Sequence, residues 1–297
     1  MNTSDTPTGR VLIIAGSDSG GGAGIQADLK TVTMLGGYAM TAITAITAQD
    51  TTGVHGVWPV ASEAVTAQIR ACLTDIGADA IKTGMLGSVH LVDQVAETLD
   101  AFARGVPRIV DPVMIATSGD RLVDEKAVSA IASVMIPDAI LVTPNAPEAE
   151  ILTGKPVDGI NGQRRAAEAL LERGAKGALV KGGHVPGKII HDVLQTEDGE
   201  WIFESERIET RSTHGTGCTL ASACAALIAQ GQIVSDAVDG ARDYLHEAIK
   251  QAPGLGKGYG KSRLIGGFIQ NAPRVGDGRC GDLDFRPKVC GTVLQRL

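Results

Sequence analysis

The sequence RVLIIAG at residues 10–16, followed by SDSGGGAG at residues 17–24, decides the fold class. The first segment is a short apolar run, which is typical of a strand buried on both faces of a parallel sheet. A glycine-rich turn follows, and after it Ile25, Leu29 and Val32 recur at helical spacing. The stretch therefore predicts a strand, a turn and a helix, which is the start of a βαβ unit.

The same order of apolar run, turn and amphipathic segment recurs along most of the chain. It predicts an α/β fold with a mostly parallel sheet covered by helices on both faces. Residues 189–195 and 200–208 instead alternate apolar and polar residues around Asp198 and Gly199, which predicts an antiparallel hairpin at the sheet edge. The other expected strands are residues 38–47, 78–82, 108–113, 138–145 and 175–181, and the other expected helices are residues 62–73, 89–104, 126–136, 164–173, 219–229 and 236–249.

Composition narrows the class of protein. A chain of 297 residues with 43% hydrophobic content is long enough to bury a large core. The formal charge of −7 provides no basic surface for nucleic acid. Five cysteines, without metal-ligand spacing, indicate reduced thiols and a cytoplasmic location. The polar residues 1–10 contain no signal-peptide core, and no apolar run reaches the ~18 residues that span a membrane, so we expect a soluble protein.

The last part of the chain differs from the rest. Residues 261–297 contain seven Lys and Arg against three Asp, hold Cys280 and Cys290, and show no sustained periodicity. We therefore expect one domain at residues 1–260 and an irregular or mobile tail at residues 261–297.

The sequence THGTGCT at residues 213–219 precedes an apolar helix and is the strongest candidate for a reactive site. Its two glycines let backbone N–H groups approach an anion, and the helix N-terminus adds a positive dipole end. Cys218 lies in the first turn, where we expect the pKa of its thiol to be lowered. A glycine-capped helix with a buried cysteine is the simpler alternative. A cysteine hydrolase that uses His214 is disfavoured, because catalytic pairs generally come from separated segments.

Four polar residues fall at or just past expected strand ends, namely Asp18, Asp111, Asn145 and Lys181. Ligands of open α/β sheets bind at this edge, so we expect these side chains to lie together. Glu148 follows Asn145 by three residues, and the two fit either a hydrated Mg²⁺ site or a helix cap.

Two glycine-rich turns remain open to two interpretations each. Residues 20–24, GGGAG, match neither the Walker loop nor the G-x-G-x-x-G spacing, so they form either a ligand-binding turn or a packed turn. Residues 181–184, KGGH, present a lysine either to a nucleotide phosphate or within an ordinary turn.

Taken together, these strings resemble the hydroxymethylpyrimidine and phosphomethylpyrimidine kinases of thiamin biosynthesis, within the ribokinase-like superfamily. The resemblance runs from about residue 11 to residue 260. It rests on AGSD at 15–18, GGAGIQADLK at 21–30, TAITAQ at 44–49, KTGML at 82–86, DPVM at 111–114, TPN at 143–145 with Glu148, KGGH at 181–184 and HGTGCT at 214–219.

The resemblance implies a ribokinase-like three-layer αβα sandwich and a homodimer. It also implies an enzyme that uses ATP and Mg²⁺ to phosphorylate 4-amino-5-hydroxymethyl-2-methylpyrimidine, and then its monophosphate to the diphosphate. A pyridoxal or pyridoxine kinase is the nearest alternative, since some share nearly the whole motif set. A non-catalytic vitamin-precursor-binding protein on the same fold is the alternative from another class.

The resemblance also assigns roles to residues. Cys218 is the expected base, because many sugar kinases of the superfamily have an aspartate there.

The tail departs from the family after residue 260, and a shifted reading frame and a lineage-specific extension both stay open. The implied sets are Gly215, Thr216 and Gly217 with Cys218 for catalysis; Gly16, Ala23, Gln49, Met85 and Val113 for the pyrimidine; Asn145, Lys181, Gly183 and His214 for ATP; and Asp111 and Glu148 for the metal.

Overall fold

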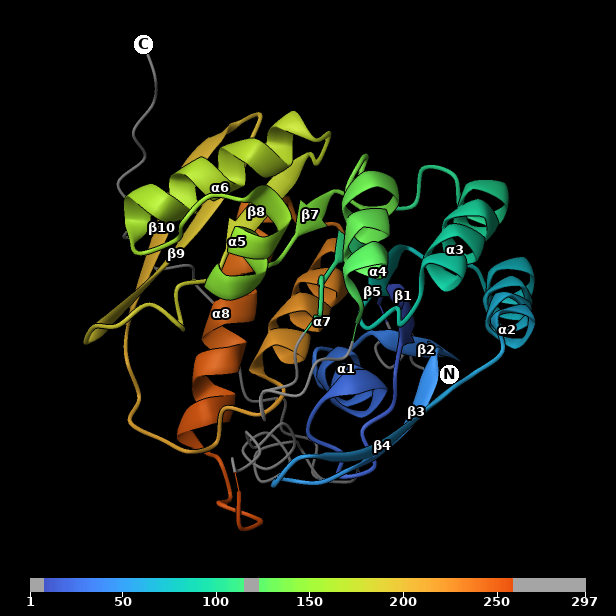
Figure 1. The fold of residues 1–297 in the computed structure, drawn as a ribbon, viewed down its shortest axis with the longest axis horizontal. Coiled ribbons are helices and arrows are strands. Elements are labelled where there is room, and N and C mark those ends of the chain that lie inside the picture. Colours follow the sequence, from blue (N-terminus) through green and yellow to red (C-terminus); the bar gives the residue numbers. More distant parts are fainter. Residues whose placement is uncertain (1–7, 115–122, 259–297) are drawn as a thin grey trace, which may run out of the picture.

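The computed structural model describes residues 8–114 and 123–258. Within these ranges the chain forms an eight-stranded sheet with helices on both faces (Figure 1). The expected tail at residues 261–297 lies outside the described residues.

The sheet has the strand order β10-β9-β8-β7-β6-β5-β1-β2. All neighbours from β2 to β8 pair in parallel, and β9 and β10 pair antiparallel at one edge, as predicted. The strands of this sheet are β1 Arg10–Ala15, β2 Tyr38–Ile43, β5 Ala80–Thr83, β6 Arg108–Val110, β7 Leu141–Val142, β8 Gly177–Val180, β9 Ile189–Thr196 and β10 Gly199–Glu206.

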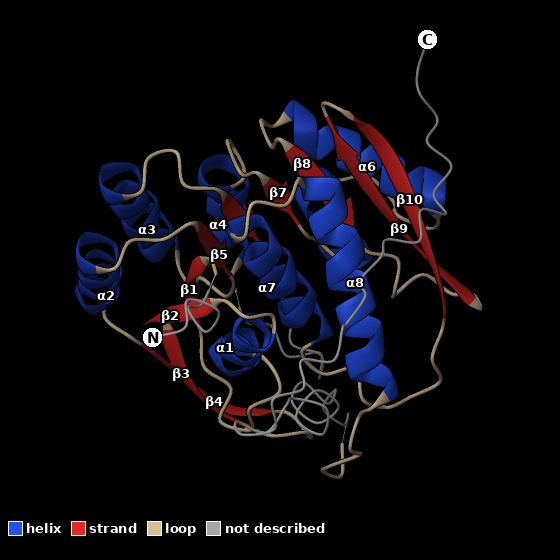
Figure 2. Cartoon of the chain, turned by 180° about the vertical axis from the view of Figure 1, so that it is seen from behind, coloured by secondary structure: helices blue, strands red, loops and turns tan. Residues whose placement is uncertain are grey.

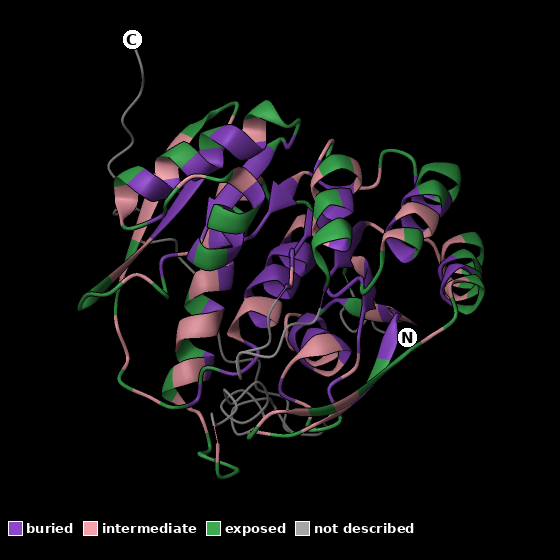
Figure 3. Ribbon diagram, in the orientation of Figure 1, coloured by how far each residue is buried: buried purple, intermediate pink, exposed green. Residues whose placement is uncertain are grey.

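Alternate residues of β1 belong to different hydrophobic cores, which explains its uninterrupted apolar sequence. Leu12 and Ile14 pack in the core under α2 to α6, whereas Val11 and Ile13 pack in the core under α1, α7 and α8. Figures 1 and 2 show the sheet between these two helical layers, and Figure 3 shows buried residues along the strands and the inner helix faces. The helices are α1 Gly24–Met34, α2 Ser62–Asp75, α3 Val89–Phe102, α4 Glu125–Ala130, the π-helix η2 Ile131–Met135, α5 Ala146–Thr153, α6 Ile160–Glu172, α7 Thr216–Ala229 and α8 Val234–Lys250.

The prediction of one strand over residues 38–47 is wrong. The chain breaks at Thr44, whose N–H donates to Ala15 O while its carbonyl accepts from Val60 N. After this break β3 (Ala45–Gln49) pairs antiparallel with β4 (Val54–Pro59) in a separate hairpin, which lies next to α1 (Figures 1 and 2). The hairpin brings Gln49 toward the carboxyl end of β1, because Ser17 N donates to Ala45 O.

No helix of residues 8–114 and 123–258 combines the length and the apolar character needed to cross a bilayer. The carboxyl ends of β1, β5, β6, β7 and β8 all lie at one edge of the sheet, since these strands are parallel. This edge is where the candidate residues were expected.

Candidate active site

The Asp18 carboxylate organises the turn that begins α1. Its Oδ1 accepts a hydrogen bond from Gly20 N, and its Oδ2 accepts from Gly22 N and Ala23 N, each at 2.8 Å. The same Oδ2 lies 3.0 Å from His214 Nε2. Burial by itself would raise the pKa of Asp18, but the hydrogen bonds from His214, Gly22 and Ala23 outweigh it and lower this pKa.

His214 is a buried residue in the loop before α7. Its Nε2 is 3.5 Å from Gln49 Nε2, so the imidazole bridges Asp18 and a residue of the expected pyrimidine set. The resemblance placed His214 with ATP, and that role stays a prediction.

The loop that begins α7 sits directly on the glycine-rich turn. Gly215 is the N-cap of α7 and has φ +78°, and a Cβ at this position would overlap Gly22 O. Only glycine fits both the backbone conformation and this close approach. The N–H groups of the first turn of α7 therefore lie at the same strand-end edge as the turn before α1.

Cys218 is less acidic than the sequence suggested. Its side chain packs against Ala27 and Ala248. Burial raises the pKa of Cys218 to about 12, although the Lys82 ammonium and the Gly24 N–H favour the thiolate. The expectation of a lowered pKa is wrong, because desolvation outweighs the positive end of the helix.

Lys181, which follows β8, lies next to both the segment after β6 and the first turn of α7. Its Nζ lies 3.4 Å from Asp111 Oδ1, and it would lie 3.3 Å from a Cβ built on Gly217. Burial disfavours the charged ammonium, but Asp111 and Glu148 outweigh it and raise the pKa of Lys181. The lysine thus remains a cation between the carboxylate after β6 and the first turn of α7.

Asp111 is buried and has one unused acceptor. Thr143 Oγ1 donates to its Oδ1 at 3.2 Å, whereas Oδ2 is buried and accepts no hydrogen bond within the described part of the chain. This oxygen lies 3.8 Å from the buried Lys82 Nζ, and a buried carboxylate oxygen without a hydrogen-bond donor suits a further cation.

Asn145 and Glu148 form the helix cap that the sequence left open. Asn145 Oδ1 accepts from Glu148 N at 2.9 Å, and Glu148 Oε2 accepts from Asn145 N at 2.8 Å. Burial raises the pKa of Glu148 to about 7, against the opposing effect of Lys181. Residues 8–114 and 123–258 contain no group of three or more His, Cys, Asp or Glu side chains placed to hold a metal. Magnesium needs only one or two carboxylates plus water and phosphate oxygens, so Asp111 and Glu148 fit such a site.

The expected pyrimidine residues come from separate segments. Met85 lies over Gly16, since a Cβ built on Gly16 would be 2.5 Å from Met85 Cε. Ala23 is the N-cap of α1, and Ile25 N donates to Gly16 O, which brings the start of α1 to the same place. Val113 lies two residues past Asp111, and its N–H donates to Asp111 O.

The sequence interpretation missed a set of buried polar residues under this edge. Lys82, Asp28 and Ser222 have no exposed surface, and both Lys82 and Ser222 donate hydrogen bonds to the Asp28 carboxylate. The sequence signal for this set is Lys82 itself, because a lysine inside the apolar run of β5 must be buried and therefore needs a partner.

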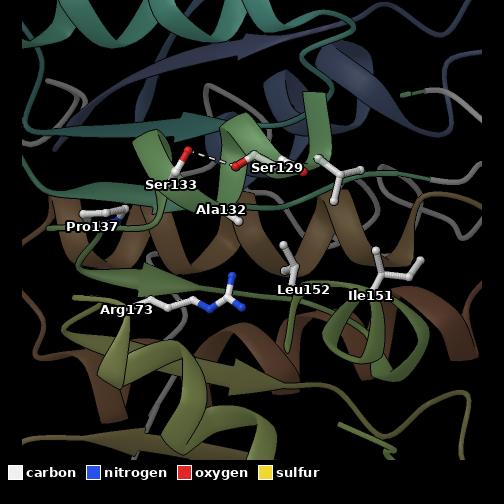
Figure 4. A pocket seen from close by; sticks show the side chains of 8 residues that line it. Ser129, Ala132, Ser133, Pro137, Ile151, Leu152 and Arg173 are labelled. Carbon is white, nitrogen blue, oxygen red and sulfur yellow. Dashed lines mark hydrogen bonds between the residues drawn. The ribbon is translucent and has the colours of Figure 1, made fainter. Parts of the chain in front are cut away.

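A pocket of about 540 Å³ lies elsewhere in the molecule (Figure 4). Its lining includes Pro137, which precedes β7, and Arg173, which precedes β8. It therefore lies near the amino ends of these strands, on the edge opposite the candidate site.

The comparisons with known proteins agree with the resemblance. A family model described as phosphomethylpyrimidine kinase matches residues 18–263. The hydroxymethylpyrimidine/phosphomethylpyrimidine kinase of Streptomyces coelicolor is 46% identical over 250 residues, which cover 84% of this chain and 92% of that relative.

Two solved structures share the fold. An ADP complex of Bacillus subtilis pyridoxal kinase is 34% identical with a TM-score of 0.81, covering 86% of this chain and 97% of its own. The phosphomethylpyrimidine kinase of Clostridium difficile is 39% identical with a TM-score of 0.72, covering 81% of this chain and 99% of its own.

Proposed function

The chain belongs to the phosphomethylpyrimidine kinase family, and from this membership we propose how its strand-end edge works. The protein is an ATP-dependent kinase of thiamin biosynthesis. It phosphorylates 4-amino-5-hydroxymethyl-2-methylpyrimidine and then converts the monophosphate to the diphosphate. The fold is that of the ribokinase-like kinases.

The position of Lys181 carries the proposal for the site. Its ammonium lies between Asp111 and the first turn of α7, where it neutralises charge on the transferring phosphoryl group. The N–H groups of Gly215, Thr216, Gly217 and Cys218 hold the same group at the helix N-terminus. Phosphoryl transfer depends mainly on such alignment and charge stabilisation, because its transition state is loose.

Cys218 is the proposed acceptor of the hydroxyl proton. The raised pKa means that only a small fraction of this residue is thiolate in the free protein at neutral pH. The charges around the sulfur therefore decide how effective the base is. If the thiol instead acts chiefly as a polar group, a serine at this position should preserve most of the turnover.

The substrate and the nucleotide occupy opposite sides of this centre in the proposal. Gln49 recognises the pyrimidine through its amide, and Met85 packs on the ring next to Gly16, Ala23 and Val113. Asn145 and Gly183 are assigned to the nucleotide. The resemblance assigns His214 to the nucleotide as well, and its position 3.5 Å from Gln49 Nε2 puts it where the two ligands meet. Mg²⁺ would be held by Asp111 and Glu148, and Asp111 Oδ2 has no hydrogen-bond donor within the described residues. The ion would neutralise phosphate charge.

We also propose a homodimer that forms through the β3–β4 hairpin. Ile46 and Trp58 face each other across the hairpin and are 47% and 58% exposed. Such an exposed apolar pair on a two-stranded sheet is typical of an interface. Trp58→Ser should shift the mass in solution from dimer to monomer, and Ile151→Ser, which changes a 51% exposed residue on α5, should not.

The location that we propose is the cytoplasm. Cys72, Cys218 and Cys224 are free in the described part of the chain, which suits a reducing compartment.

A coupled assay tests the function directly. The purified protein should consume ATP with the hydroxymethylpyrimidine and with its monophosphate, and much faster than with pyridoxine or pyridoxal. A strong preference for the pyridoxine class would favour the alternative kinase, and ligand binding without ATP consumption would favour a binding protein. Cys218→Ala should lower kcat by about 100-fold, and Cys218→Ser should restore little of it if the thiol is a base.

A further inference from the structure

Lys82 is a charged residue in the centre of the sheet. It lies in β5, opposite Ile13 of β1 and Ile109 of β6, and its side chain is 0% exposed. Its Nζ lies 3.1 and 3.0 Å from the two carboxylate oxygens of Asp28 on α1, which is also fully buried.

The ion pair lies one helical turn beneath Cys218. At the first level, Gly24 begins α1 and its N–H favours the thiolate of Cys218, in the first turn of α7. Four residues further along each helix, Ser222 Oγ donates to Asp28 Oδ1 at 2.6 Å. Residues four apart share a helix face, so the Asp28–Ser222 level lies directly below the Gly24–Cys218 level.

Lys82 also reaches the site on its other side. Its Nζ is 3.8 Å from Asp111 Oδ2, the buried oxygen without a hydrogen-bond donor in the described residues. It would lie 3.1 Å from a Cβ built on Gly84, in the segment that leads to Met85. The ammonium is thus below both the metal-side carboxylate and the segment that carries Met85.

Stability does not explain a buried ion pair at this position. Removing two charges from water is unfavourable, and apolar residues of similar volume often stabilise a protein equally or better. The position of the pair under Cys218 and Asp111 suggests a role in the reaction.

We propose that Lys82 is a positioning residue for phosphoryl transfer. Its ammonium, held by Asp28, orients the Asp111 carboxylate and supplies positive charge beneath Cys218 and the first turn of α7. This inference rests on the proposed function, in which those two groups face the transferring phosphoryl.

The charges that face the thiol make the role testable. Burial raises the pKa of Cys218, Lys82 of β5 lowers it, and the carboxylates of Asp28 on α1 and Asp111 after β6 raise it. Lys181, after β8, also interacts with the thiol, and both variants leave this lysine in place. Removing the lysine and removing its aspartate partner should therefore change the thiol in opposite directions.

The experiment measures the rate at which iodoacetamide alkylates Cys218 as a function of pH, with the modified peptide quantified by mass spectrometry. Lys82→Met should lower the rate at a fixed pH by about tenfold, which corresponds to one pKa unit. Asp28→Asn, which keeps the shape of the side chain, should raise it by a similar factor. Lys82→Arg should stay near the wild type, since it keeps the charge.

The control removes an ion pair at the opposite edge of the sheet. Arg10 and Asp79 are joined there at 2.6 Å, and Arg10→Met with Asp79→Asn should leave the alkylation rate unchanged. If Lys82→Met does not fold, the alkylation rate of Asp28→Asn alone tests the proposal, and a rate that does not rise would overturn it. Unchanged rates, or rates that move in the same direction in both variants, would overturn the proposal. The readout needs no substrate, so its failure is distinguishable from failure of the kinase assay on the wild type.

Discussion

The imidazole of His214 lies against the carboxylate of Asp18, with Nε2 3.0 Å from Oδ2. The two residues are 196 positions apart, and the contact ties the loop before α7 to the turn before α1. Because backbone N–H groups of Gly22 and Ala23 bind the same carboxylate oxygen, this one charge holds the two loops together.

Asp18→Asn should therefore weaken the fold at neutral pH by about 2 kcal/mol, since hydrogen bonds to a buried charge are lost. The pKa of Asp18 is lowered in the folded protein, so its stabilisation is present above the ordinary value of 3.8 and is lost as the pH falls through the folded value. The difference between variant and wild type should shrink below about pH 4 in urea unfolding. Asp75→Asn, at an exposed end of α2, is the control, and a difference that does not depend on pH would contradict the assignment.

Gly215→Ala should separate the same two loops from the other side. At φ +78° the alanine is strained, and its Cβ would overlap Gly22 O. Gly231→Ala is the matched control, because Gly231 has φ +90° but no atom within 4 Å of the added Cβ. We expect a loss of about 1 kcal/mol for Gly231→Ala and at least ~2 kcal/mol more for Gly215→Ala, measured by urea unfolding. Equal losses would mean that the loop contact contributes nothing.

The strands and their order of alternation were predictable from the sequence because buried parallel strands are continuously apolar. Residues 10–24 identified β1, the turn and the start of α1 correctly. The break at Thr44, where the chain leaves the main sheet and enters the β3–β4 hairpin, was not predictable. The sequences of β2 and β3 form one continuous run, and only the hydrogen bonds of Thr44 to Ala15 and Val60 separate the two strands. The strand β4 was missed because it is mostly exposed and contains Gly56 and Pro59.

In the candidate site too, features with a local sequence signal were predictable and features set by long-range contacts were not. Strand ends predicted that Asp111, Asn145 and Lys181 lie at one edge. The isolated bridge between Asn145 and Lys181 and the 3.4 Å contact of Lys181 with Asp111 confirm it. Periodicity cannot give the depth of a side chain below the surface, so the burial that raises the pKa of Cys218 was missed. The pairing of Lys82 with Asp28 joins residues 54 positions apart and has no local signal.

Gly16→Ala should disturb the proposed pyrimidine site without unfolding the protein. The added Cβ would lie 2.5 Å from Met85 Cε, and this flexible end can move away only by changing the surface on which the ring packs. We expect KM for the pyrimidine to rise by about tenfold, with the melting temperature nearly unchanged. Gly87→Ala, in the segment just after Met85, has no atom within 4 Å of its added Cβ and should leave KM unchanged.

Arg207 shapes the loop that is assigned to the nucleotide. Its guanidinium donates to Gly183 O at 2.8 Å, Val185 O at 2.6 Å and Gly187 O at 2.7 Å, so one side chain holds the turn after Lys181. Arg207→Ala should raise KM for ATP by about tenfold and change kcat by less than about twofold, because the loop must then be ordered on binding.

A second variant separates loop geometry from charge. Arg207→Lys keeps the cation but has no planar fork to reach three carbonyls, so it should behave like the alanine variant. Lys188→Ala removes an exposed cation from the same loop and should leave KM for ATP unchanged. If lysine at position 207 restores the wild-type KM, Arg207 acts through its charge on the phosphates, and the hydrogen bonds to the loop carbonyls are incidental.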